Sequence, residues 1–161
     1  MSPLAQLIHS SPHFRLLLVS SELSLIDRQL LDYIASLSGS VDIYCFPDSY
    51  DNFKHNAIRK IEIMKDYSSG LRCASREYEA VVLHNVLHRH TDPLKFLQLV
   101  YRSMENSAEI IVLQSKENSN SSQLEEWLEN SEFRAHNTIY DLIKDYDVTV
   151  AKKLHMWGNG L

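Results

Sequence analysis

Five short apolar runs, separated by more polar segments, constrain the fold of this chain more than any other feature. The runs span residues 14–19, 41–46, 60–64, 80–84 and 109–113. Apolar runs of this length that end at turn residues are typical of strands buried on both faces of a sheet. Such a sheet needs helices on both of its faces. The pattern therefore predicts an α/β fold with a mostly parallel sheet.

Helix signals lie between these runs. Ser24 and Asp27 resemble a capping box, and apolar residues continue from there at helical spacing until Gly39. Asp92 and Pro93 occupy the favoured first positions of a second helix, which places a proline where its missing N–H costs nothing. Both helices follow directly after predicted strands, as right-handed crossovers in a parallel sheet require.

The remaining segments are assigned from their turn residues and periodicity. Residues 50–59 are interpreted as a short helix, and residues 60–64 fit either a strand or an extension of that helix. A third helix is expected to begin at Ser122. Residues 133–143 and 147–154 are expected to form a closing pair of strands.

Composition fits one globular domain and argues against several classes of function. The chain has 161 residues, of which 44% are apolar, so we expect residues 1–161 to form a single domain. The net charge of -5 and the scattered Lys and Arg argue against nucleic-acid binding. No window reaches the roughly 18 consecutive apolar residues of a membrane span, and we expect a cytoplasmic protein without membrane contact. Cys45 and Cys73 lack the spacing of a zinc or redox motif.

The ends of the predicted strands locate a candidate site. In open parallel sheets, ligands bind at the carboxyl ends of the strands. The candidate loops are therefore those after Val19, Phe46, Met64 and Leu83.

Residues 77–115 carry a resemblance to a known family. They read EYEAVVLHNVLHRHTDPLKFLQLVYRSMENSAEIIVLQS, and the matching positions are Tyr78, Val81, Val82, Asn85, Leu87, His88, Asp92, Pro93, Leu97 and Arg102. The segment resembles the fourth strand, the following helix and the fifth strand of class I S-adenosylmethionine-dependent methyltransferases. The order of elements over residues 14–154 is also similar to that family. The resemblance implies a Rossmann-like methyltransferase sheet with helices on both faces and an antiparallel last strand.

The loop after the first predicted strand departs from that family. The family carries E/D-x-G-x-G-x-G there, because glycines let backbone amides approach the cofactor. Here the loop reads Ser20-Ser21-Glu22-Leu23-Ser24 and has no glycine. The resemblance implies S-adenosylmethionine as the cofactor, and the altered loop predicts weakened or lost binding. An active methyltransferase with an unusual cofactor loop is the alternative.

The resemblance also implies which residues would contact the cofactor. They are Ser20, Ser21, Glu22, Asp48, Asp66 and His84. Asp48 resembles the carboxylate that accepts hydrogen bonds from the ribose hydroxyls, and Asp66 resembles the acidic residue at the adenine amino group. Both are equally consistent with solvated aspartates in turns. His84 and Asn85 end the fourth predicted strand, where a substrate would meet the cofactor, and they are the candidates for catalysis.

Metal ions and partners complete the expectations. His84, His88 and His90 have a spacing that could place two of them on one face, but no Glu or Cys stands beside them, and we assign no metal. If the protein is active, its partner is a small-molecule or protein methyl acceptor. If it is inactive, the sheet is expected to serve as an interaction scaffold for a protein partner.

Overall fold

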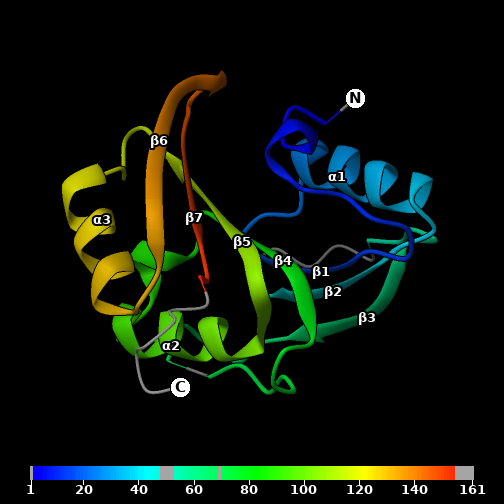
Figure 1. The fold of residues 1–161 in the computed structure, drawn as a ribbon, viewed down its shortest axis with the longest axis horizontal. Helices are drawn as coiled ribbons and strands as arrows, with labels where there is room; N and C mark the ends of the chain where they lie inside the picture. The colour runs from blue at the N-terminus through cyan, green and yellow to red at the C-terminus, as the bar shows by residue number, and fades with distance from the viewer. Residues whose placement is uncertain (1, 48–52, 69, 155–161) are drawn as a thin grey trace.

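The computed structural model describes residues 2–47, 53–68 and 70–154, which form a seven-stranded sheet with helices on both faces (Figure 1). The strands are β1 (Arg15–Ser20), β2 (Ser40–Cys45), β3 (Ile58–Ile63), β4 (Tyr78–His84), β5 (Met104–Ser115), β6 (Arg134–Ile143) and β7 (Tyr146–Lys152). Their order in the sheet is β3-β2-β1-β4-β5-β7-β6. Strands β1 to β5 are parallel, and β7 is antiparallel to both β5 and β6. This arrangement confirms the predicted mostly parallel sheet with an antiparallel last strand.

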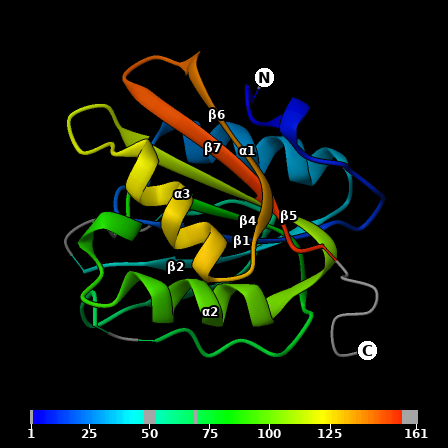
Figure 2. The same ribbon diagram turned by 60° about the vertical axis from the view of Figure 1, so that its left-hand side comes forward.

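Helices cover the two faces of the sheet unequally (Figure 2). The helices are α1 (Leu25–Ser36), α2 (Pro93–Ser103) and α3 (Ser121–Asn130), with short 3-10 turns η1 (Ala5–Leu7) and η2 (Leu87–Arg89). Helix α1 packs on one face, and α2 and α3 pack on the other. Helices α1 and α2 begin directly after the predicted caps Ser24 and Asp92, whereas α3 is capped by Asn120, two residues before the predicted cap Ser122. In the described residues no helix is long and apolar enough to cross a membrane.

The strands alternate their side chains between two separate cores. Leu16 and Leu18 of β1 pack in the core under α1, and Leu17 and Val19 pack in the core under α2 and α3. All four side chains are buried. The continuous apolar run of residues 14–19 is therefore explained by burial on both faces.

The segment between β2 and β3 differs from the prediction. Residues 53–57 contain no helix, and β3 begins at Ile58, so a helix over residues 53–59 was wrong. The strand interpretation of residues 60–64 is confirmed as far as Ile63. Pairing with β2 explains the difference, because β-branched side chains fit a pleated sheet surface and tertiary contacts override a weak local helical pattern. Residues 48–52 lie outside the described residues.

Strand β5 is longer than predicted and follows α2 without a loop. It begins at Met104 instead of residue 109, and its register with β4 shifts between Tyr78 and Ala80. The Lys153 ammonium donates hydrogen bonds to the carbonyls of Tyr101 and Met104, at 2.9 and 2.8 Å. These bonds join the segment after β7 to the junction between α2 and β5.

Candidate functional site

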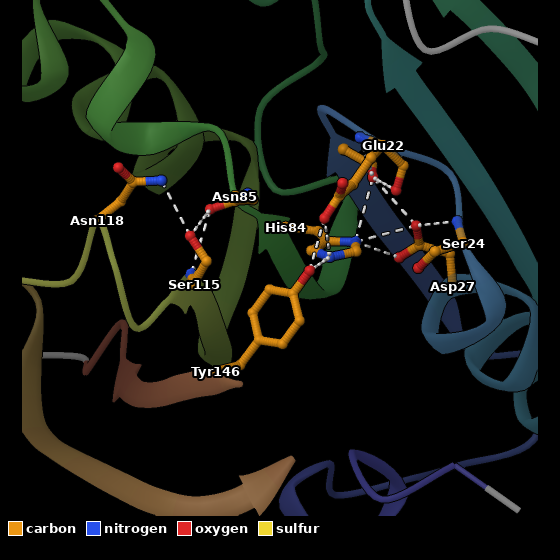
Figure 3. A network of polar contacts seen from close by, with 9 residues as sticks. Glu22, Ser24, Asp27, His84, Asn85, Ser115, Asn118 and Tyr146 are labelled. Atoms are coloured by element: carbon orange, nitrogen blue, oxygen red, sulfur yellow. Dashed lines mark hydrogen bonds and ion pairs between the residues drawn. The ribbon is translucent and has the colours of Figure 1, made fainter. Parts of the chain in front are cut away.

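Polar side chains meet where the carboxyl ends of β1 and β4 reach the start of α1 (Figure 3). Ser20 ends β1 and pairs in register with His84, which ends β4. Asp27 comes from the first turn of α1. All three side chains are fully buried, so each needs hydrogen-bond partners within the protein.

The Asp27 carboxylate is the centre of this network. It lies 2.9 Å from the His84 ring atom Nδ1 and accepts a hydrogen bond from the Ser20 hydroxyl at 3.1 Å. It also accepts the backbone N–H of Ser24 at 3.1 Å, which is the carboxylate half of the predicted capping box. Asp27 therefore joins the helix start to the ends of both strands.

A second arm of the network runs from His84 to the surface. The His84 ring atom Nε2 lies 3.2 Å from the hydroxyl of Tyr146, the first residue of β7. That hydroxyl donates a hydrogen bond of 2.6 Å to the carboxylate of Glu22, which is exposed. Burial, and then the bond to Glu22, raise the pKa of Tyr146 above its ordinary value. The network thus links the loop after β1 to the far strand β7.

Backbone amides of the loop after β1 are used within the protein. The N–H of Ser21 donates to the His84 carbonyl at 3.1 Å, and the N–H of Glu22 donates to the Ser20 hydroxyl at 3.2 Å. The N–H of Ser24 donates to Asp27. Glycine-rich loops hold cofactors by presenting such amides to the ligand. As folded, this loop does not fit S-adenosylmethionine in that manner, because three of the four amides after Ser20 already have protein acceptors.

The other predicted cofactor residues are placed differently. The Ser21 side chain is buried, and its hydroxyl has no hydrogen-bond partner in the described residues. Asp66 is exposed, and its carboxylate accepts hydrogen bonds from the backbone and the hydroxyl of Ser68 at 2.9 and 2.5 Å, as in an Asx turn. Asp48 lies outside the described residues.

Asn85 follows His84 in sequence but contacts a different group of residues. Its backbone φ of 58° is left-handed, a conformation that asparagine tolerates better than most residues. Its side-chain oxygen accepts hydrogen bonds from the backbone and hydroxyl of Ser115, and Asn118 donates to that same hydroxyl. Figure 3 shows Asn85 directed toward Ser115 while His84 is directed toward Asp27. The two candidate catalytic residues therefore do not form one group.

The three histidines of the HxxxHxH pattern also separate. His84 belongs to the Asp27 network, whereas His90 stacks on Phe96 at 3.8 Å and meets Tyr67 edge-on at 5.5 Å. His90 donates from Nδ1 to the Val86 carbonyl at 2.9 Å, and burial lowers its pKa. In the described part of the chain, no three His, Cys, Asp or Glu side chains are arranged to hold a metal ion.

An open cleft of about 480 Å³ lies beside the ends of β2 and β3. Its lining residues are Tyr44, Glu62, Ile63, Met64, Lys65, Gly70 and Arg72. It shares no residue with the Asp27 network. Its mixed charges do not point to one class of ligand.

Sequence reasoning missed two members of the network. Asp27 was interpreted only as a helix cap, and Tyr146 carried no signal at all. The contacts of His84 with them span 57 and 62 positions along the chain. The only local indication was that a buried predicted strand ends at His84 and that the first predicted helix begins with the acidic residue Asp27. Parallel pairing of β1 with β4 brings these two positions together.

Comparisons with known proteins agree with this fold. The sequence matches no protein-family model and no curated protein. Among solved structures it is similar to a SAM-dependent methyltransferase from Aquifex aeolicus, with a TM-score of 0.72, 16% identity and coverage of 89% of this chain and 84% of that one. It is also similar to phosphoethanolamine N-methyltransferase 2 of Haemonchus contortus, solved with phosphomonomethylethanolamine and S-adenosylhomocysteine (TM-score 0.69, 10% identity, 91% of this chain and 50% of that one).

A third similar structure is a complex between the Haloferax volcanii Trm112 methyltransferase activator and a methyltransferase. Its TM-score is 0.66 at 13% identity, with coverage of 95% of this chain and 88% of that one. Together with the strand order β3-β2-β1-β4-β5-β7-β6, these similarities define the fold. The chain has the Rossmann-like fold of class I S-adenosylmethionine-dependent methyltransferases.

Proposed function

We propose that this chain is a methyltransferase-like protein in which S-adenosylmethionine binding is weakened or lost. The observation that carries the proposal is the loop after β1, whose amides at Ser21, Glu22 and Ser24 are hydrogen-bonded within the protein. A ligand at this loop would have to replace those bonds. Breaking them without an equal replacement costs free energy and lowers affinity.

The chemistry of methyl transfer makes the affinity for S-adenosylmethionine decisive for function. The sulfonium of S-adenosylmethionine is an activated methyl donor, so an enzyme of this kind chiefly binds and orients its substrates. In this chain, Ser20, Asp27 and His84 bind one another and are fully buried. A buried His84 without exposed surface does not meet a methyl acceptor directly. These contacts support a structural role for Ser20, Asp27 and His84, which would otherwise surround the reacting groups of a methyltransferase.

A non-catalytic scaffold for a protein partner is the second candidate function. One observation favours it: a similar structure contains an activator protein. An active enzyme would instead use a small-molecule or protein methyl acceptor. A measurement of cofactor binding distinguishes the scaffold from the active enzyme.

Isothermal titration of the full chain with S-adenosylmethionine and S-adenosylhomocysteine tests the proposal. We expect no binding tighter than about 1 mM, which corresponds to roughly -4 kcal/mol. Binding near 1 μM, roughly -8 kcal/mol, that is lost in Asp48→Ala and kept in the control Asp51→Ala would instead support an active methyltransferase with an unusual loop.

A further inference from the structure

Strand β3 lies at an open edge of the sheet (Figure 1). Among the described residues it pairs only with β2. An edge strand carries backbone N–H and C=O groups that can pair with a further strand. The sequence of β3 is Ile-Arg-Lys-Ile-Glu-Ile, which has no proline to prevent such pairing.

The direction of the β3 backbone groups follows from its pairing with β2. The N–H of Met64 donates to the Cys45 carbonyl of β2 at 2.7 Å. The register of β3 with β2 shifts between Ile58 and Lys60, and from Lys60 onward the backbone groups alternate, so Glu62 and Lys60 also direct theirs toward β2. Ile61 and Ile63 therefore direct their N–H and C=O groups to the open edge.

We propose that β3 pairs antiparallel with β3 of a second copy of this chain, with Ile61 on the two-fold axis. A symmetric dimer uses the same surface on both copies, so the surface has to be complementary to itself. With Ile61 opposite the partner's Ile61, Lys60 lies opposite the partner's Glu62, and this ion pair occurs twice. The charges along one strand thus select a second copy of the same strand.

Backbone hydrogen bonding and charge together exclude the neighbouring registers of the two β3 strands. A shift of one residue would place outward backbone groups opposite inward ones. A shift of two residues in either direction places Lys60 opposite the partner's Lys60, or Glu62 opposite the partner's Glu62, and like charges directly opposite each other destabilise a strand pair. Only the register centred on Ile61 has both hydrogen bonds and complementary charges.

The side chains of β3 are available for this contact. Lys60 and Glu62 form no ion pair within the described residues, and the Lys60 ammonium lies 5.7 Å from the centroid of the Tyr44 ring. On the opposite face of the strand, Ile61 is partly exposed and Ile63 is 50% exposed. In the proposed dimer Ile61 lies opposite Ile61 of the other copy and diagonal to its Ile63, which removes apolar surface from water.

The first test is the mass of the full chain in solution. Light scattering after gel filtration, at about 100 μM protein, is expected to give twice the chain mass of 18.6 kDa. Lys60→Glu and Glu62→Lys each place like charges opposite each other twice, and each is expected to weaken self-association by about tenfold or more. The double variant Lys60→Glu/Glu62→Lys restores the opposite charges and is expected to restore the dimer. Circular dichroism checks that each variant is folded.

The second test determines the register through disulfide formation, in a Cys73→Ser background. Chains carrying Lys60→Cys are mixed with chains carrying Glu62→Cys and oxidised. Directly opposite residues have Cα atoms about 4.5 Å apart, within disulfide range, whereas Glu62 and the partner's Glu62 would be roughly 8 Å apart. A cross-linked dimer is expected in the mixture and not with either variant alone.

Two results would overturn the proposal. One is a monomeric wild-type chain at these concentrations, which would show that the charged edge prevents pairing. The other is a dimer that neither charge change weakens or whose cysteines link equally in all three samples, since such a dimer uses another face or register.

Discussion

Two regions of the molecule, residues 77–115 and the loop of residues 20–24, use their side chains in opposite ways. Residues 77–115 keep an apolar pattern up to His84 and beyond it, and the buried apolar side chains of α2 pack with Tyr78, Val81 and Leu83 of β4 into the core beneath α2 and α3. The loop of residues 20–24 is instead held by hydrogen bonds among Ser20, Asp27 and His84. The strand order is that of the methyltransferase fold even with a loop that has no glycine. The fold therefore forms without a glycine-rich loop, and in this chain hydrogen bonds among buried polar groups hold the loop in place.

The largest expected effect comes from removing the centre of the polar network. Asp27→Ala leaves the His84 ring and the Ser24 amide without their carboxylate acceptor, whereas the Ser20 hydroxyl keeps the Glu22 carbonyl, and the expected loss of unfolding free energy is about 4 kcal/mol. Urea denaturation monitored by circular dichroism measures it. The matched control is Asp32→Ala on the same helix, whose carboxylate is largely exposed and whose pair with His55 is expected to contribute about 1 kcal/mol. Equal losses in the two variants would show that the network contributes nothing beyond a surface ion pair.

The apolar region should respond to loss of volume. Leu97 of α2 is fully buried, and Leu97→Ala is expected to lower the free energy of unfolding by about 3 kcal/mol, through lost burial and a residual cavity. The same urea experiment applies, with the partly exposed neighbour Leu99 changed to Ala as the control. A loss no greater than that of Leu99→Ala would remove the distinction between the two regions.

A smaller effect is expected where the network reaches β7. Tyr146→Phe removes the hydroxyl between His84 and Glu22 and is expected to cost about 1 kcal/mol at neutral pH. Because folding raises the pKa of Tyr146, this contribution is present below the unfolded pKa of about 10 and is lost as pH rises above it. Unfolding free energies of wild type and variant at pH 7 and pH 11 test this, with Tyr140→Phe as an exposed control. A difference that is the same at both pH values would contradict the expectation.

The smallest effect concerns His90 and acid. Burial lowers the pKa of His90, so the unfolded chain takes up a proton below about pH 6.5 while the folded ring stays neutral. Stability is therefore lost as pH falls below 6.5, by less than about 1.4 kcal/mol for each pH unit. His90→Phe should lose less stability between pH 7.5 and pH 5.5 than wild type does, whereas the exposed control His13→Phe should behave like wild type. Parallel losses in wild type and His90→Phe would exclude this residue as the cause.

Most of the element order followed from local patterns. Continuous apolar runs identified strands buried on both faces, and capping residues such as Ser24 and Asp92 located the helix starts. The exception was the segment before β3, where a weak helical pattern over residues 53–59 gave way to pairing with β2. A periodicity over so few residues is compatible with both structures, and the neighbouring strand decides between them.

By itself, the sequence determined the absence of glycine in residues 20–24 and the burial pattern that specifies the sheet, because both are properties of consecutive residues. Only the tertiary structure decided what replaces the glycines. Asp27, His84 and Tyr146 are separated by 57 and 62 positions and meet because β1, β4 and β7 end or begin at one edge. Hydrogen bonds between buried groups depend on that three-dimensional placement, which no local spacing encodes.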